Sequence, residues 1–179
     1  MKEEKVIFRK GEMIHLRPVL KEDLEILVIH MNDEETMINL SGVFPISYED
    51  ELKWFKDQNK KTTNIVLAVV ENSTYKLTGT VGLHGINYID GTATTGFCLI
   101  KRFWSNGYGT EAAQLLLTFA FKHLNLRKIN SSVLSFNLRS LRLHMKMGYK
   151  EEGVLKKQRY RDGVYVDEIL LSLFKKDFL

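Results

Sequence analysis

The sequence predicts an α+β fold in which helices flank a mixed sheet of antiparallel and parallel strands. Two patterns lead to this prediction. Segments rich in β-branched residues occupy the middle and the end of the chain, whereas apolar residues in the first third keep helical spacing. A segment with helical spacing also separates two of the β-rich segments, and a crossover of this kind makes the two strands parallel neighbours.

The composition is that of an ordinary soluble protein. The 179 residues, of which 44% are hydrophobic and 27% charged, most simply form a single domain over residues 1–179. A net charge of +4 favours an anionic ligand but is too small to indicate nucleic-acid binding. The one cysteine, Cys98, excludes an internal disulfide and cannot form a metal site alone. We expect a cytoplasmic protein with no metal, membrane or nucleic-acid partner.

The first third of the chain is predicted to be mainly helical. Asn32 or Asp33 can cap a short helix that ends at Asn39. Ser47 to Asp50 has the capping-box pattern, which predicts the start of another helix. The elements expected here are a strand over 13–17, a helix over 21–30, the short helix that ends at Asn39, and a helix after Ser47 that buries Leu52 and Phe55.

The β-rich middle of the chain is interrupted by two turn signals. A polar segment over 71–76 and the pair Asp90-Gly91 separate its strands, so three strands follow one another in antiparallel order. The expected elements are strands over 64–70, 77–86 and 93–100, a helix over 107–123, and a strand over 128–134 that runs parallel to 93–100.

The last part of the chain is expected to add a helix and a hairpin. The helix covers 137–147 and ends at Gly148, a residue that readily adopts the left-handed cap conformation. Strands over 149–155 and 164–174 follow, joined around the turn signal Asp162-Gly163.

The segment from Trp104 to Ala112 is the first candidate for function. Gly107 and Gly109 stand between a predicted strand and a predicted helix, and neither has a Cβ atom to keep a ligand away from the backbone. The N-terminus of the helix adds unpaired N–H groups and roughly half a positive charge. Such a turn binds phosphate, although two spaced glycines alone are more often a plain turn.

A second candidate is one face of the helix over 137–147. Asn137, Ser140 and His144 are spaced i, i+3 and i+7 and therefore share that face. Asn137 also suits the N-cap position in either case. The alternative is that Asn137 is only an N-cap, Ser140 is incidental and His144 is a surface residue.

Together the two segments resemble the GCN5-related N-acetyltransferase (GNAT) superfamily, in its branch of ribosomal-protein-alanine and spermidine acetyltransferases. Leu16-Arg17-Pro18 near the start and Asp162-Gly163 near the end also resemble that branch, so the resemblance covers almost the whole chain. The residues that match the two motifs of the family are Gly107, Gly109, Asn137, Ser140, Lys146, Gly148 and Tyr149.

The resemblance implies the acyl-CoA N-acyltransferase fold and an N-acetyltransferase that uses acetyl-CoA as acyl donor. The neutral amine of the acceptor would attack the thioester directly in a ternary complex. Backbone N–H groups would hold the pyrophosphate, the strand end would pair with the pantetheine arm, and two helix residues would contact that arm. The implied cofactor-binding residues are Leu99, Ile100, Lys101, Asn106, Gly107, Tyr108, Gly109, Thr110, Asn137 and Ser140.

The chain departs from the family pattern at three positions. Trp104 replaces the Arg or Gln before the glycines, so the backbone must hold the phosphate. His144 replaces the Tyr that protonates the departing thiolate, and imidazole can serve as general acid. Thr94 replaces a Glu that many relatives use as base. His84 and Tyr88 are candidates for the base by strand position only, and water that leads out of the cleft is another possible proton acceptor.

The sequence does not identify the acceptor amine. A polyamine, a protein N-terminus, a lysine, an amino sugar and an aminoglycoside all remain. The acidic clusters over 33–35 and 49–51 would suit a cationic acceptor, but such clusters are usually solvated surfaces. Two other interpretations are a non-catalytic acyl-CoA-binding or sensing module on the same fold, and a protein that binds nucleotide phosphates. Homo-oligomerisation is also left open.

Overall fold

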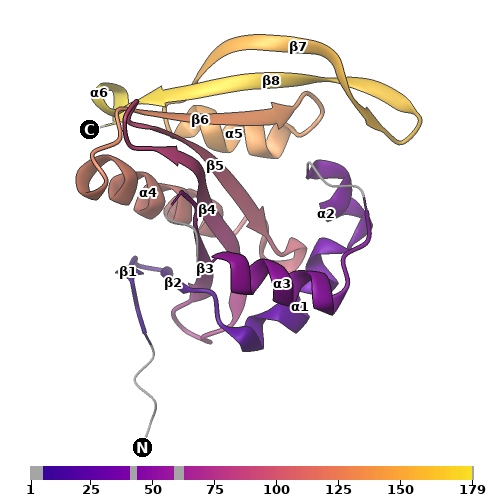
Figure 1. The fold of residues 1–179 in the computed structure, drawn as a ribbon, viewed down its shortest axis with the longest axis vertical. Helices are drawn as coiled ribbons and strands as arrows, with labels where there is room; N and C mark the ends of the chain where they lie inside the picture. Colours follow the sequence, from indigo (N-terminus) through magenta and orange to yellow (C-terminus); the bar gives the residue numbers. More distant parts are fainter. Residues whose placement is uncertain (1–5, 41–43, 59–62, 179) are drawn as a thin grey trace, which may run out of the picture.

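The structure is a computed structural model that describes residues 6–40, 44–58 and 63–178. Within these ranges, eight strands form one sheet in the order β1-β2-β3-β4-β5-β6-β8-β7 (Figure 1). The strands are β1 (Arg9–Lys10), β2 (Ile14–Pro18), β3 (Ile65–Glu71), β4 (Leu77–Asn87), β5 (Thr92–Leu99), β6 (Lys128–Leu134), β7 (Lys150–Arg161) and β8 (Val164–Phe174). The helices are α1 (Leu24–Met31), α2 (Glu34–Asn39), α3 (Tyr48–Gln58), α4 (Tyr108–Thr118), α5 (Leu138–Lys146) and α6 (Lys175–Phe178).

The parallel pair of strands lies in the middle of the sheet. β5 and β6 are parallel, and every other strand pair of the described sheet is antiparallel. Their pairing covers only residues 92–94 of β5 and 128–130 of β6. Beyond these positions the strands diverge, and Figure 1 shows the gap widening toward their C-terminal ends. The prediction that the two strands are parallel neighbours is confirmed.

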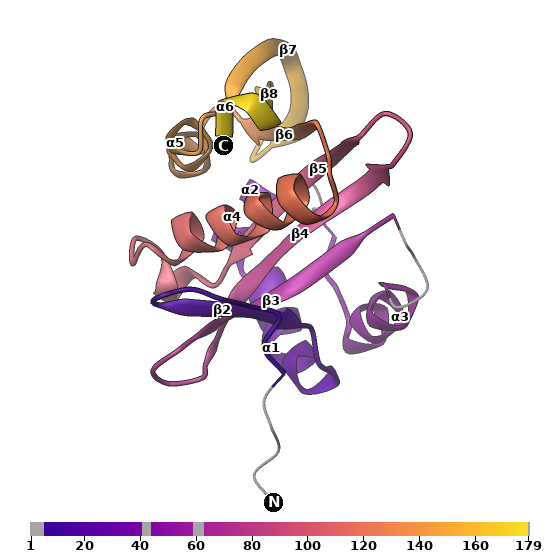
Figure 2. The same ribbon diagram turned by 90° about the vertical axis from the view of Figure 1, so that its left-hand side faces the viewer.

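Helices cover both faces of the sheet, and β3 shows why. Leu67 and Val69 belong to the cluster beneath α4, whereas Ala68 and Val70 belong to the cluster beneath α1 and α3. Side chains alternate along a strand, so a run that is apolar at every position must be buried on both sides. α4 lies in front of the sheet in Figure 2, and α1 lies behind it. We call the two faces the α4–α5 side and the α1–α3 side.

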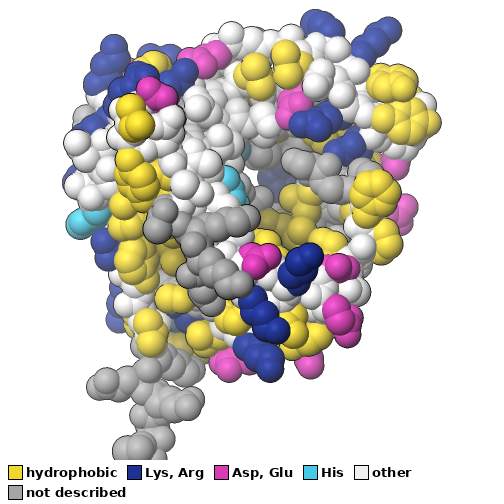
Figure 3. All heavy atoms as spheres, in the orientation of Figure 1, with side chains coloured by type: hydrophobic (Ala, Val, Ile, Leu, Met, Phe, Trp, Pro, Cys, Tyr) yellow, Lys and Arg dark blue, Asp and Glu magenta, His cyan; other side chains and the backbone are white. Residues whose placement is uncertain are grey.

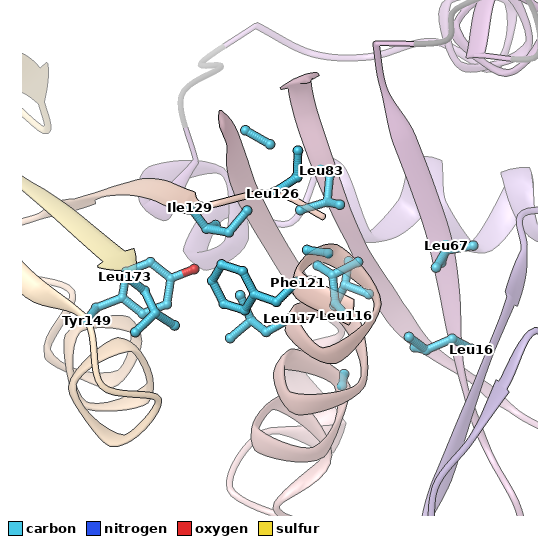
Figure 4. Close-up of a cluster of buried hydrophobic side chains, with 14 of the residues drawn as sticks. Leu16, Leu67, Leu83, Leu116, Leu117, Phe121, Leu126, Ile129, Tyr149 and Leu173 are labelled. Atoms are coloured by element: carbon cyan, nitrogen blue, oxygen red, sulfur yellow. The ribbon is translucent and has the colours of Figure 1, made fainter. Parts of the chain in front are cut away.

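The larger core lies on the α4–α5 side. Leu116, Leu117 and Phe121 project from α4 and the turn after it onto strands from both halves of the sheet (Figure 4). All three side chains are fully buried. Burial of one such side chain contributes roughly 1.5–3 kcal/mol. This helix therefore holds the two halves of the sheet together where β5 and β6 separate.

The local signals in the sequence correspond to observed caps and turns. The side chain of Asp33 accepts a hydrogen bond from the N–H of Thr36 and caps α2. Ser47 and Asp50 cap each other at the start of α3. Asp162 and Gly163 both have positive φ, 44° and 83°, as the predicted two-residue hairpin turn requires.

Several elements differ from the predicted ones. β7 continues to Arg161 instead of ending at 155, because irregular pairing between 155 and 159 disturbs its alternation. The helix predicted over 107–123 ends with a π-helical turn over Phe119–His123. β1, α6 and the short 3₁₀ helix Lys101–Phe103 had no distinct sequence signal, and the helix predicted over 21–30 begins with a 3₁₀ turn over Lys21–Asp23. No helix in the described ranges is long and apolar enough to cross a membrane.

Candidate active site

A cavity of about 700 Å³ opens where β5 and β6 diverge. Its walls are formed by β5 and β6 from the point where their pairing ends, His84 of β4, the start of α4, one face of α5, the end of β7, Glu168 of β8 and residues of α2. The molecule is visibly hollowed on the side shown in Figure 3. The cavity thus connects the α4–α5 side of the sheet with the α1–α3 side.

The alternation of β5 divides its cavity-lining side chains between the two faces. The ring of Phe97 packs edge-on against His144 of α5, with a centroid distance of 5.5 Å. The Sγ atom of Cys98 lies 3.3 Å from the Nε2 atom of His30 on α1. Odd-numbered residues of this segment therefore face α4 and α5, and even-numbered residues face α1 to α3.

The same alternation shows which backbone groups of β5 are unpaired. The N–H of Ile100 donates to the carbonyl of Thr78 on β4, at 2.8 Å. Successive N–H groups of a strand point in opposite directions, so those of Phe97 and Leu99 point away from β4 toward β6. The ladder with β6 has already ended at Thr94. β5 thus presents a short open edge to the cavity.

Two residues implied as pantetheine partners do not lie at this edge. Leu99 lines the cavity, but Ile100 packs against the core of the α1–α3 side and its N–H is engaged by Thr78. Lys101 forms an ion pair with Glu35 and lies outside the cavity. The strand ends at Leu99, one residue earlier than expected, and this moves the open edge back to Phe97 and Leu99.

The glycine-containing turn brings the start of α4 to the cavity. Ser105 and Gly107 have φ of 66° and 85°, and Gly107 is the N-cap residue. Gly109 and Thr110 line the cavity, and the first turn of a helix has N–H groups without helical partners. A Cβ atom on Gly109 would lie 3.0 Å from Cδ1 of Leu99. The glycine therefore allows the helix to approach β5 closely.

The other two residues of the predicted phosphate loop have different positions. Asn106 is exposed and is not among the residues that line the cavity. The hydroxyl of Tyr108 donates to the carboxylate of Glu71 on β3, so its side chain is directed away from the cavity. Any contribution of these two residues to a phosphate site comes from their backbone.

α5 contributes more positive charge than the sequence motifs suggested. Asn137 caps the helix by accepting the N–H of Ser140 at 3.1 Å, and both line the cavity. Arg139, Arg142 and Lys146 line it as well. The two arginines were missed, although their spacing with Lys146 is also i, i+3 and i+7. These three cations suit a polyanionic ligand that lies along α5.

Trp104 connects the open edge of β5 with α5. Its indole N–H donates to the carbonyl of Leu99 at 2.6 Å. The guanidinium of Arg139 lies over the indole, 3.6 Å from the ring centroid. Trp104 thus occupies one acceptor of the open strand edge and fixes one cation of the cavity wall.

His144 is a buried residue of the cavity wall. Its Nδ1 atom lies 2.7 Å from the backbone carbonyl of Ser140, and its Nε2 atom lies 2.8 Å from Oγ of Ser131 on β6. A carbonyl only accepts hydrogen bonds, so Nδ1 carries a proton and Nε2 of the neutral ring accepts from the serine. Burial lowers the pKa of His144, and the hydrogen bond to Ser140 offsets part of this effect.

His84 lies on the opposite side of the sheet. Its ring packs over two glycines, because a Cβ atom on Gly82 or Gly96 would lie 3.0 Å from its Nε2 atom. The residue lines the cavity together with Thr94, and burial lowers the pKa of its imidazole. Tyr88, the other predicted candidate for the base, is 56% exposed and lies outside the cavity.

The acidic clusters of the first third do not line this cavity. Residues 33–35 border a separate, smaller depression with Lys101, and residues 49–51 line neither. Among the described residues of the cavity wall, the one carboxylate is that of Glu168 on β8. The described part also contains no group of three or more His, Cys, Asp or Glu residues placed to hold a metal ion.

Comparison with known proteins supports the interpretation of this geometry. The acetyltransferase (GNAT) domain family matches residues 14–150. The prophage-derived uncharacterized N-acetyltransferase YokL of Bacillus subtilis is 29% identical over 174 residues, which cover 97% of this chain and 96% of the relative. Spermidine N(1)-acetyltransferase of Escherichia coli is 27% identical over 168 residues, which cover 93% and 88%.

Solved structures show the same fold. Spermidine N-acetyltransferase from Vibrio cholerae, in complex with CoA and spermine, aligns with a TM-score of 0.87 at 21% identity over 94% of this chain and 99% of that one. A GNAT-family acetyltransferase from Bacillus anthracis aligns with a TM-score of 0.80 at 25% identity, over 95% and 99%. Because the family match covers more than half of the chain, this protein belongs to the GNAT acetyltransferases and is an N-acetyltransferase.

Proposed function

We propose that the chain acts as a single N-acetyltransferase domain that transfers an acetyl group from acetyl-CoA to a primary amine. The observation that carries this proposal is the open edge of β5, which faces the cavity beside the N-terminus of α4. A thioester on a long amide-containing arm with a pyrophosphate fits both features at once. The relative from Vibrio cholerae, solved with CoA and spermine, supports a donor and an acceptor of these kinds.

The donor lies on the α4–α5 side in this proposal. The first turn of α4, at Gly109 and Thr110, binds the pyrophosphate through backbone N–H groups and the helix dipole. Arg142 and Lys146 neutralise the remaining phosphate charge. The pantetheine arm pairs with the edge of β5, so that an N–H of Phe97 or Leu99 polarises the thioester carbonyl.

The acceptor amine enters from the α1–α3 side and attacks the thioester directly. His84 is the base, because it lines the cavity on that side and its lowered pKa keeps the imidazole neutral near pH 7. A neutral imidazole takes the proton that the amine nitrogen loses as the new C–N bond forms. Positioning both reactants in one cavity supplies up to roughly 7–11 kcal/mol of the barrier reduction.

Protonation of the leaving thiolate is assigned to His144, acting next to Ser131. In the imidazolium form, Nε2 donates to Oγ of Ser131, and the serine hydroxyl is then free to donate into the cavity. The lowered pKa makes this form a minority at neutral pH. Loss of the His144 proton therefore limits turnover more strongly as the pH rises.

The test is release of free thiol from acetyl-CoA with a panel of primary amines, together with calorimetric titration of CoA. We expect CoA binding and amine-dependent thiol release. CoA binding without release for any amine would instead indicate a non-catalytic acyl-CoA-binding module. Preference for ATP over CoA would contradict the placement of the donor.

A further inference from the structure

The acceptor side of the cavity carries an ion pair that the proposed chemistry does not use. The carboxylate of Glu168 accepts hydrogen bonds from Nε of Arg159 at 2.9 Å and from Oγ of Ser132 at 2.7 Å. Ser132 follows Ser131, which faces His144, so Ser132 and its partners lie on the α1–α3 side. Both members of the pair line the cavity.

The guanidinium of Arg159 is held at one edge and open at the other. Glu168 engages Nε and, at 3.4 Å, Nη2. The Nη1 atom has no hydrogen-bond partner among the described residues, and 39% of the side chain is exposed. The side chain of Glu168 is only 9% exposed and is occupied by two donors. Glu168 therefore positions Arg159, and Arg159 offers N–H groups to the cavity.

The charge around this pair is positive. Arg161 stands next to it in the cavity wall and donates to the carbonyls of Ile38 and Leu40, which fixes α2 against β7. Among the described residues of the cavity wall, the Arg and Lys side chains outnumber the one carboxylate, which is that of Glu168. A polycation would meet repulsion here, and the acidic clusters that would suit one lie elsewhere.

We propose that the acceptor is a primary amine that carries a carboxylate, which Arg159 binds. Planar guanidinium groups bind carboxylates through two parallel hydrogen bonds, and a free Nη1–Nη2 edge has the geometry for this. The amine at the other end of the acceptor then reaches the β5 edge near His84. This inference rests on the proposed transferase function and names the class of its acceptor.

The ionisation of Glu168 agrees with a positioning role. Burial raises the pKa of Glu168, but hydrogen bonds from Arg159 and Ser132 and the charges of Arg159 and Arg161 outweigh it, so the pKa lies below its usual value. The carboxylate stays ionised at neutral pH and keeps its hold on Arg159. A Glu168→Gln variant would release the guanidinium without removing its charge.

The experiment compares acceptors in matched pairs. α-, β-, γ- and ε-amino acids are each offered beside their carboxamides, with spermidine as the polycation, and kcat/KM is measured by thiol release. Binding of the same compounds to the CoA-saturated protein is measured by calorimetry. We expect at least one amino acid to exceed its carboxamide roughly tenfold or more in both measurements, the size of a lost charged hydrogen bond.

Variants separate this inference from the proposed function. Arg159→Gln should abolish the preference for the carboxylate, Arg159→Lys should retain part of it, and Glu168→Gln should weaken it. Lys156→Gln, on the same strand but 77% exposed and outside the cavity, should change nothing. CoA affinity reports that each variant is folded. A better reaction with carboxamides or spermidine, or a preference unchanged in Arg159→Gln, overturns the inference. Absence of thiol release with every amine would overturn the proposed transferase function. The calorimetric comparison of amino acids with their carboxamides would still test whether Arg159 binds a carboxylate.

Discussion

Replacing Trp104 with Phe tests whether the carbonyl of Leu99 belongs to the coenzyme site. In the free protein this carbonyl accepts the indole N–H at 2.6 Å, and Phe keeps a ring beneath Arg139 but has no donor. Leaving a half-buried carbonyl unpaired costs about 1–3 kcal/mol. We therefore expect the free energy of unfolding of the CoA-free variant to fall by about 1–2 kcal/mol.

CoA should reverse most of this loss. If the pantetheine arm pairs with the edge of β5, an amide N–H of the arm replaces the indole as donor to Leu99. Because the loss then affects only the free state, CoA should bind more tightly, by up to about tenfold for about 1.4 kcal/mol. Most single substitutions in a binding cavity weaken binding, so the sign of this effect is informative.

The measurements are urea unfolding with and without CoA and calorimetric titration of CoA. Trp54→Phe on α3 is the control, since Trp54 lies outside the cavity and should leave CoA affinity unchanged. Equal or weaker CoA binding in Trp104→Phe would refute the reasoning, because it would show that the arm does not use the carbonyl of Leu99.

Three further predictions concern the cavity and the buried histidines. His144→Phe should lower kcat by roughly 10²–10⁴-fold, the usual contribution of a general acid, with CoA affinity nearly unchanged; an unchanged rate and pH profile would exclude the assigned role. Gly109→Val should weaken CoA binding measured by titration, because its Cβ atom would already lie 3.0 Å from a leucine methyl group, whereas Gly153→Val has open space and should not. Burial lowers the pKa values of His30, His84 and His144, so below pH 6.5 the unfolded chain binds protons that the folded protein does not. Urea unfolding should therefore show stability falling from pH 7.5 to 5.5, with a smaller fall in His84→Gln; a flat profile would contradict this burial effect.

Local signals in the sequence were enough to place most of the fold. Each cap or turn needs only a few adjacent residues, as at Asp33, at Ser47 with Asp50, and at Asp162-Gly163. The helix between β5 and β6 also fixed their parallel direction. The end of β7 was missed because its bulges break the alternation from which strands are recognised.

The sequence motifs predicted the cavity residues that belong to the turn and the helix caps. They did not predict which residues at the end of β5 face the cavity, because this depends on where the strand ends. Gly109, Thr110 and Asn137 line the cavity as the motifs indicated. Lys101 does not, because the strand ends at Leu99 and the chain then turns into a 3₁₀ helix. A shift of one residue along a strand reverses which side the groups face, and the sequence pattern does not resolve such a shift.

Arg159 shows a second limit. It lies more than fifty positions after β5 in the chain, on a strand whose full length was not predicted. Charged residues on an edge strand are usually solvated, so composition alone gives no reason to select this one. Only the fold brings β7 beside α2 and turns its end toward the cavity, as the bonds from Arg161 to Ile38 and Leu40 show.

The separation of β5 from β6 is itself stabilised by side chains. At the last paired position, the carbonyl of Asn130 accepts the hydroxyl of Thr95 at 3.3 Å, and that hydroxyl also contacts the hydroxyl of Tyr149 at 3.1 Å. One step further along β6, Ser131 binds His144. The ring of His144 also packs edge-on against Tyr149, so these side chains form a buried polar cluster on the α4–α5 side where the two strands separate. His144 of α5 therefore has a structural role besides any chemistry, because it links Ser131 of β6 to the rings of Phe97 and Tyr149 at the point where the edge of β5 becomes open.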